Sequence, residues 1–197
     1  MKLLPNPPKP NLPPPIAQNK PNETKYLPSM SEIMTSSRDR KLDLRIQTVG
    51  PFFRVTANNA EGGGGELGRA EGVVRPWFGC GKILHLDSIK LKPETLALKE
   101  RSLLGVGLFV GAVAVRYGYD CGCTTAQLLA IYDSDVYHSK LVRFYKRMGF
   151  EAVYEVKGSS MGDMAHMLTW GGVGTLMDAD VEDLLLKWSN VFTKSTA

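Results

Sequence analysis

The spacing of apolar residues predicts extended strands in the first half of the folded region. Residues 43–57 form extended segments on either side of Gly50-Pro51, and residues 67–78 continue as a further strand. Residues 82–91 alternate regularly, which is typical of a strand with two different faces. One predicted face carries Ile83, His85, Asp87, Ile89 and Leu91, and the other carries Leu84, Leu86 and Ser88.

Helical spacing predicts four helices, over residues 29–40, 105–119, 137–149 and 178–192. Their ends carry suitable residues: Ser29 or Ser31 to cap the first, Gly118 or Gly122 to stop the second, and Gly149 to end the third. The last helix is expected to start on aspartates, which suit the positive end of a helix dipole.

Short apolar runs at residues 126–132, 150–156 and 166–170 are strand candidates between and after these helices. The alternation of strands and helices predicts an α/β (α+β) fold, with a mixed, mostly antiparallel sheet and helices packed over it. We expect a single folded unit at 29–175, a C-terminal helix and tail at 176–197, and a tail at 1–28.

The first 28 residues contain nine of the twelve prolines, which disfavour both helix and central strand. We expect a disordered or polyproline II tail, either plainly solvated, a docking ligand for an aromatic groove, or a targeting segment. No acidic residue precedes Glu23, which leaves the cytoplasm and the chloroplast both open as compartments.

Composition narrows the function classes. The formal charge of +4 arises in the first 45 residues, which hold eight Lys or Arg against four Asp or Glu, while the rest is balanced. A neutral body argues against direct nucleic-acid binding. The apolar run 102–115 is too short and too glycine-rich to cross a membrane. The three cysteines, Cys80, Cys121 and Cys123, indicate a reducing compartment and are interpreted as packing residues rather than a metal or redox pair.

The glycine-bearing entry to the second predicted helix is the first candidate site. At a helix N-terminus the backbone amides are unpaired, and Gly105 and Gly107 have no Cβ to hold a ligand away. These amides can bind a pyrophosphate, or the glycines can serve tight packing of a helix on a sheet. The sequence leaves both readings open.

The second candidate is the run "RFYKRMGF", residues 143–150. It resembles the "LYEKLGF" signature of GNAT acetyltransferases, while "LLAI" and "IKLKPE" resemble the fifth strand and the end of the fourth strand of that family. The resemblance spans about Lys82 to Trp170. Within the superfamily, the sequence as a whole resembles a plant branch. It implies an N-acetyltransferase with acetyl-CoA as cosubstrate, no metal, and an amine acceptor.

Carried over by position, the resemblance implies the following cofactor-binding residues. The CoA pyrophosphate would lie on the amides of Leu104, Gly105, Val106, Gly107, Leu108 and Phe109. The pantetheine arm would contact the backbone of Ile89 and Leu91, and His138 stands where many members carry an asparagine that touches this arm. Ser102 stands where the family usually has Arg or Gln, with Lys99 and Arg101 nearby.

The resemblance also implies that Tyr145 is the general acid that protonates the departing CoA thiolate. Without it, an aromatic packing residue is the simpler interpretation of this position. His85 and Asp87, on one face of residues 82–91, are candidates for the base that deprotonates the amine, although structural or merely solvated side chains are the simpler interpretation of both. The acceptor can be a protein N-terminus, a lysine or a small amine.

The part of the fold that would bind the acceptor is smaller than in the family. The family forms its amine pocket with a first strand and the two helices that follow it, and only one short helix is predicted here. A second chain in a homodimer, a large acceptor on an open groove, or loss of catalysis would each account for this. The rival functions are therefore a non-catalytic CoA-binding regulator and an interaction protein that works through its proline-rich tail.

Overall fold

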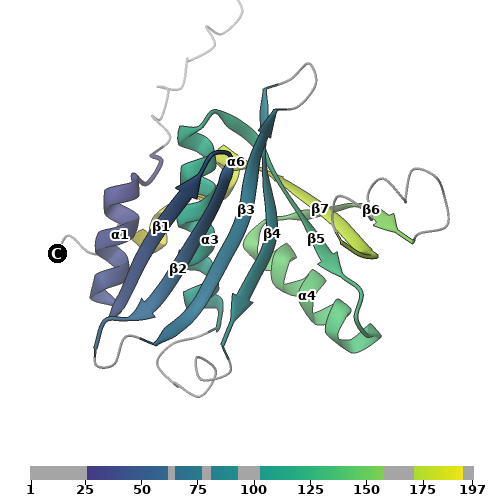
Figure 1. The fold of residues 1–197 in the computed structure, drawn as a ribbon, viewed down its shortest axis with the longest axis horizontal. Helices are drawn as coiled ribbons and strands as arrows, with labels where there is room; N and C mark the ends of the chain where they lie inside the picture. The colour runs from purple at the N-terminus through teal and green to yellow at the C-terminus, as the bar shows by residue number, and fades with distance from the viewer. Residues whose placement is uncertain (1–25, 62–64, 77–80, 93–102, 158–170, 193–197) are drawn as a thin grey trace, which may run out of the picture.

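The computed structural model describes residues 26–61, 65–76, 81–92, 103–157 and 171–192 (Figure 1). Its helices are α1 (Met30–Asp39), α3 (Leu103–Asp120), α4 (Asp135–Met148) and α6 (Val181–Phe192). Its strands are β1 (Leu42–Val49), β2 (Phe52–Asn59), β3 (Glu66–Pro76), β4 (Lys82–Leu91), β5 (Cys123–Ile131), β6 (Glu151–Val156) and β7 (Gly174–Asp180).

The seven strands form one mixed sheet in the order β1-β2-β3-β4-β5-β7-β6. Only the central pair, β4 and β5, is parallel, and every other neighbouring pair is antiparallel. The predicted fold class, a mostly antiparallel α/β sheet with flanking helices, is therefore confirmed.

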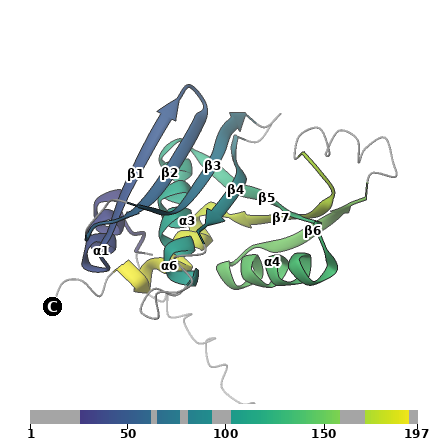
Figure 2. The same ribbon diagram turned by 60° about the horizontal axis from the view of Figure 1, so that its bottom comes forward.

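The helices gather on one face of the sheet, as Figures 1 and 2 show together. α3 packs along the middle of the sheet and also touches α1 and α6. α4 lies beside α3, since a Cβ on Gly107 would meet Phe144 and one on Gly111 would meet Met148. Within the described ranges no helix covers the opposite face. The buried core lies between the sheet and this helical layer, around Leu84, Leu86, Phe109 and Val110.

The local signals at the helix ends are those that the sequence predicted. Ser29 caps α1 and forms a capping box with Glu32. Gly149 adopts the left-handed conformation at the end of α4, with φ 117°. At the end of α3 the stop is Gly122, with φ 82°. Gly118 lies inside the helix, where an added Cβ would stand 2.9 Å from Leu84, so its role is close packing on β4.

A bulge corrects the predicted faces of β4. Glu71 of β3 pairs with Ser88, while the next residue, Gly72, pairs with Leu86, so Asp87 is an extra residue on β4. The bulge inverts the alternation beyond Asp87. Ile89 and Leu91 therefore lie on the helical side with Leu84 and Leu86 and not on the His85 side, as the strict alternation had predicted.

The last strand was missed by the sequence pattern. Asp178 and Asp180, expected at the start of the final helix, belong to β7, and α6 begins only at Val181. β7 pairs with β5 on one side and with β6 on the other, and this pairing holds its aspartates in an extended conformation. The expected boundary after residue 175 falls inside this strand. The strand candidate at 166–170 lies outside the described residues.

Candidate functional site

The two parallel strands separate halfway along the sheet. β4 and β5 are paired from Lys82 and Cys123 up to Leu86 and Leu128, and the pairing stops there. Beyond this point β4 continues to Leu91, paired only with β3 among the described strands, and Figure 1 shows β4 and β5 diverging. The edge of β4 that faces β5 from Asp87 to Leu91 thus offers main-chain groups to an extended ligand.

The first turn of α3 lies beside the end of β4, and its two glycines have different surroundings. A Cβ on Gly105 would meet nothing within 4 Å, so the space that a side chain would take there is open. A Cβ on Gly107 would stand 3.1 Å from Phe144 and 3.5 Å from Leu91. Gly105 therefore fits the interpretation as part of a pyrophosphate site, and Gly107 fits the interpretation as a position for tight packing.

The other residues expected at this turn could contact a ligand only through the backbone. The side chains of Val106 and Phe109 are buried in the core, and that of Leu108 is half-buried. Unpaired amides at the start of an 18-residue helix remain suited to a phosphate. Lys99, Arg101 and Ser102 lie outside the described residues.

Tyr145 is almost fully buried on the inner face of α4. Its ring packs edge-on against Phe144 and Phe150, with centroids 5.3 and 6.1 Å away. Burial, and to a smaller extent the charge that Tyr137 would carry, raises the pKa of the Tyr145 phenol well above its usual value. The hydroxyl is therefore protonated and able to donate throughout the neutral range.

His85 and Asp87 meet on the face away from the helices. The distance from His85 Nε2 to Asp87 Oδ1 is 2.8 Å, with His85 only 2% exposed and the Asp87 side chain 51% exposed. The predicted placement of the two on one face is thus confirmed. In this arrangement the buried imidazole can accept a proton, and the solvent-exposed carboxylate can pass that proton on to water.

Sequence reasoning missed the polar neighbours of this pair. Gln127 of β5 pairs with His85 in register and accepts a hydrogen bond from Arg75 at 3.4 Å. A single glutamine in an apolar strand carries no local signal. Only the register of β4 against β5 reveals that it adjoins the histidine.

His138 points toward β7. Its Nε2 lies 3.0 Å from the Thr175 hydroxyl, and its ring lies 5.1 Å from that of Tyr132. His138 and Thr175 line a cavity of about 390 Å³. The other residues that line it are Tyr132, Glu155, Val156, Lys157, Val173 and Gly174. β7 is the neighbour of β5 on the side opposite β4. A contact between His138 and a pantetheine arm stays a prediction.

The cysteines of the described part of the chain pack at one end of the sheet. Cys121 and Cys123 are both free thiols. Burial, with the nearby charge of Cys121, raises the pKa of the Cys123 thiol to about 11, which keeps it unreactive. In the described ranges no three His, Cys, Asp or Glu side chains are arranged to hold a metal ion. Nor does any helix there have the length and apolarity to span a bilayer.

Comparison with known proteins gives matches at the level of structure. No family model and no curated relative matches the sequence. A protein from Desulfovibrio desulfuricans described as an acetyltransferase of the GNAT family has 19% identity and a TM-score of 0.45, over 67% of this chain and 70% of its own.

Two further solved structures are similar. A chain of the NatC complex, bound to Gag peptide and CoA, has 10% identity and a TM-score of 0.47 over 77% of this chain and 90% of its own. The KacTA–DNA complex contains a chain with 10% identity and a TM-score of 0.48, over 73% of this chain and 76% of its own. Identities this low concern the fold and leave the chemistry to be argued from the site.

Proposed function

We propose that the protein is an N-acetyltransferase that transfers the acetyl group of acetyl-CoA to an amine. The observation that supports this most is the opening between β4 and β5, which lies beside the first turn of α3. An open strand edge can bind the amide groups of a pantetheine arm, and free helix amides next to it can bind a diphosphate. CoA contains both groups in this order.

In the proposed reaction the neutral amine attacks the thioester carbonyl of bound acetyl-CoA. The C–N bond forms, the C–S bond breaks, and the sulfur leaves as a thiolate that takes a proton from the Tyr145 hydroxyl. The second proton, which the nitrogen releases as the amide forms, restores the Tyr145 hydroxyl. His85, held by Asp87, accepts the proton that the ammonium must lose before attack. The Tyr145 phenol, whose pKa burial raises, is protonated at neutral pH and can donate to the negative charge that develops on the sulfur.

The test has two stages. Calorimetric titration with acetyl-CoA and with CoA measures binding, and acetylation of a mixed peptide library and a panel of small amines measures transfer. We expect Tyr145→Phe to retain CoA binding and to lower the rate of transfer about 100-fold, in line with loss of one general acid. Tyr137→Phe is the matched control, because Tyr137 lies exposed on the same helix. A Tyr145→Phe variant with wild-type turnover would disprove the acid assignment.

A non-catalytic CoA-binding protein is the second candidate. It is favoured by the uncovered face of the sheet, which leaves no helical wall for a small amine among the described residues. Tight CoA binding with no acetylation of any peptide or amine would support it over the transferase. Loss of CoA binding itself would exclude both.

A further inference from the structure

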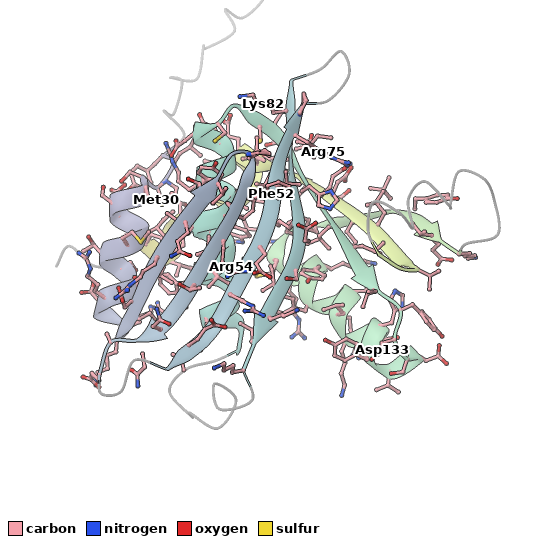
Figure 3. The ribbon with its side chains drawn as sticks, viewed as in Figure 1. Met30, Phe52, Arg54, Arg75, Lys82 and Asp133 are labelled. Atoms are coloured by element: carbon pink, nitrogen blue, oxygen red, sulfur yellow. The ribbon has the colours of Figure 1, made fainter. Side chains whose placement is uncertain are left out.

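The uncovered face of β1, β2 and β3 has an unusual composition. These three strands contain four arginines, Arg45, Arg54, Arg69 and Arg75, and no lysine. Strand pairing places all four on the face away from the helices, since Arg45 and Arg69 both lie opposite Thr56, Arg54 lies opposite Glu71, and Arg75 follows four residues later. Figure 3 shows Arg54 and Arg75 on the side turned to the viewer.

Two large apolar side chains are exposed on the same face. Val49 and Phe52 are directly paired across the β1–β2 hairpin and are 79% and 60% exposed. Figure 3 labels Phe52 near the arginines. Arginine and aromatic residues are enriched at protein–protein interfaces, whereas lysine is depleted there. Exposed apolar residues among arginines therefore match the centre of a protein interface.

A cross-strand row connects this surface with the proposed base. Val49 pairs with Phe52, Phe52 with Val73, Val73 with His85, and His85 with Gln127. Exposure falls along the row from Val49 to the buried His85. Neighbouring strands are about 4.8 Å apart, so Phe52 and His85 are separated by roughly 10 Å. A chain bound over Phe52 would thus reach His85 within about three extended residues.

The charge of the face sets the chemistry of the partner. Three carboxylates on these strands oppose the four arginines. Asp43 pairs with Arg45 at 2.9 Å, and Glu71 lies 2.6 Å from Arg54 and 3.9 Å from Arg69. The third is Glu66, at the start of β3. Arg75 has a neutral partner, Gln127. These strands therefore keep one net positive charge, beside the apolar pair at the hairpin end.

We propose that this face, defined by Val49, Phe52 and the four arginines, binds an acidic polypeptide. Resting on the proposed function, the row to His85 further assigns this polypeptide as the acceptor, so that the substrate class is a protein amine flanked by acidic residues. A polynucleotide fits less well, because Val49 and Phe52 add exposed apolar surface and three of the arginines already lie within 4 Å of a carboxylate.

The test uses the full chain and three labelled probes measured by fluorescence anisotropy. The probes are a 20-residue peptide of Glu, Leu and Tyr with one lysine, its counterpart with Arg in place of Glu, and a 20-nucleotide single-stranded DNA. We expect the acidic peptide to bind more tightly than the other two. Phe52→Ser and Arg54→Gln should each weaken its binding about tenfold, as for a residue at the centre of an interface.

Matched controls lie in the helical layer. Arg38→Gln makes the same change of charge on α1, and Val136→Ser removes an exposed apolar side chain from α4. Neither should alter binding of the acidic peptide. Equal effects of the face and control variants, equal binding of both peptides, or tighter binding of the DNA at the face would each overturn the proposal.

Transfer assays separate this proposal from the proposed function. With acetyl-CoA, Phe52→Ser and Arg54→Gln should raise KM for the acidic peptide and leave transfer to a small amine unchanged. If no acetyl transfer occurs to any amine but the face variants still lose the acidic peptide, the proposed function fails and the binding surface stands. If transfer occurs and the face variants leave KM for the peptide unchanged, the acceptor assignment fails alone.

Discussion

Gly72 is the single residue on which the bulge of β4 depends most directly. A Cβ at this position would lie 2.1 Å from the carbonyl oxygen of His85 and 2.8 Å from the ring of Phe53. Backbone cannot move aside as a flexible side chain can. We expect Gly72→Ala to destabilise the protein by about 3 kcal/mol or more, measured by urea unfolding. Stability equal to wild type would mean that the β3–β4 register differs from the one described.

Cys123 gives a pH dependence that can be worked out from one thiol. Its pKa is raised to about 11 in the folded chain, so in the unfolded chain it ionises at a lower pH. Between about pH 9 and 11 the unfolded state binds fewer protons than the folded state, and folding stability falls as pH rises. We expect Cys123→Ala to flatten this decline by on the order of 2 kcal/mol at pH 11.

The measurement is chemical denaturation of both proteins at pH 7, 9, 10 and 11. Only the difference in slope matters, because Cys123→Ala also removes a buried sulfur and lowers stability at every pH. Cys121→Ala should flatten the decline less, since this thiol is the less buried of the two and its charge is the smaller cause of the raised pKa of Cys123. Parallel curves for wild type and Cys123→Ala would contradict a buried thiol.

At the scale of elements, α3 offers a matched pair of glycines. Gly105→Ala should stabilise the apoprotein by up to about 1 kcal/mol, because alanine favours a helix and the added Cβ meets no neighbour. Gly107→Ala should gain less or lose stability, since its Cβ presses on Phe144 at 3.1 Å. If a diphosphate binds this turn, Gly105→Ala should also weaken CoA binding at least about tenfold by blocking its approach.

Thermal unfolding and CoA titration of the two variants give a stability and an affinity for each, and these values decide which glycine adjoins the ligand and which packs against Phe144. A Gly105→Ala protein that is more stable and binds CoA like wild type would remove Gly105 from the binding site. A Gly107→Ala protein more stable than Gly105→Ala would mean that Phe144 does not pack where the structure places it.

The elements that could be predicted from the sequence are those with strong local signals. α4 was predicted within two residues at its start, because Gly149 and the helical spacing of its apolar residues are both local. β7 was missed because its two aspartates and flanking glycines are poor strand formers, and only pairing with β5 and β6 makes it a strand. The faces of β4 were predicted correctly up to Asp87, where a bulge set by the partner strand intervenes.

At the scale of the whole molecule, the candidate site combines residues that the sequence indicates one by one with an arrangement in space that it does not indicate. The sequence predicts that His85 and Asp87 share one face, because they alternate on one short strand. The separation of β4 from β5, the uncovered face of the sheet and the row from Phe52 to Gln127 depend on the register between distant segments. Sequence spacing alone carries no information on that register.

The position of a bound cosubstrate can be mapped over the whole chain by amide hydrogen exchange. If acetyl-CoA lies between β4 and β5, its binding should slow exchange at residues 87–91 and in the first turn of α3, where amides gain partners. β1 is separated from this opening by β2 and β3 and should exchange as before. Protection around His138 and Thr175 instead would place the ligand in the cavity on the β7 side of β5, and the proposed roles of Gly105 and of the β4 edge would both be wrong.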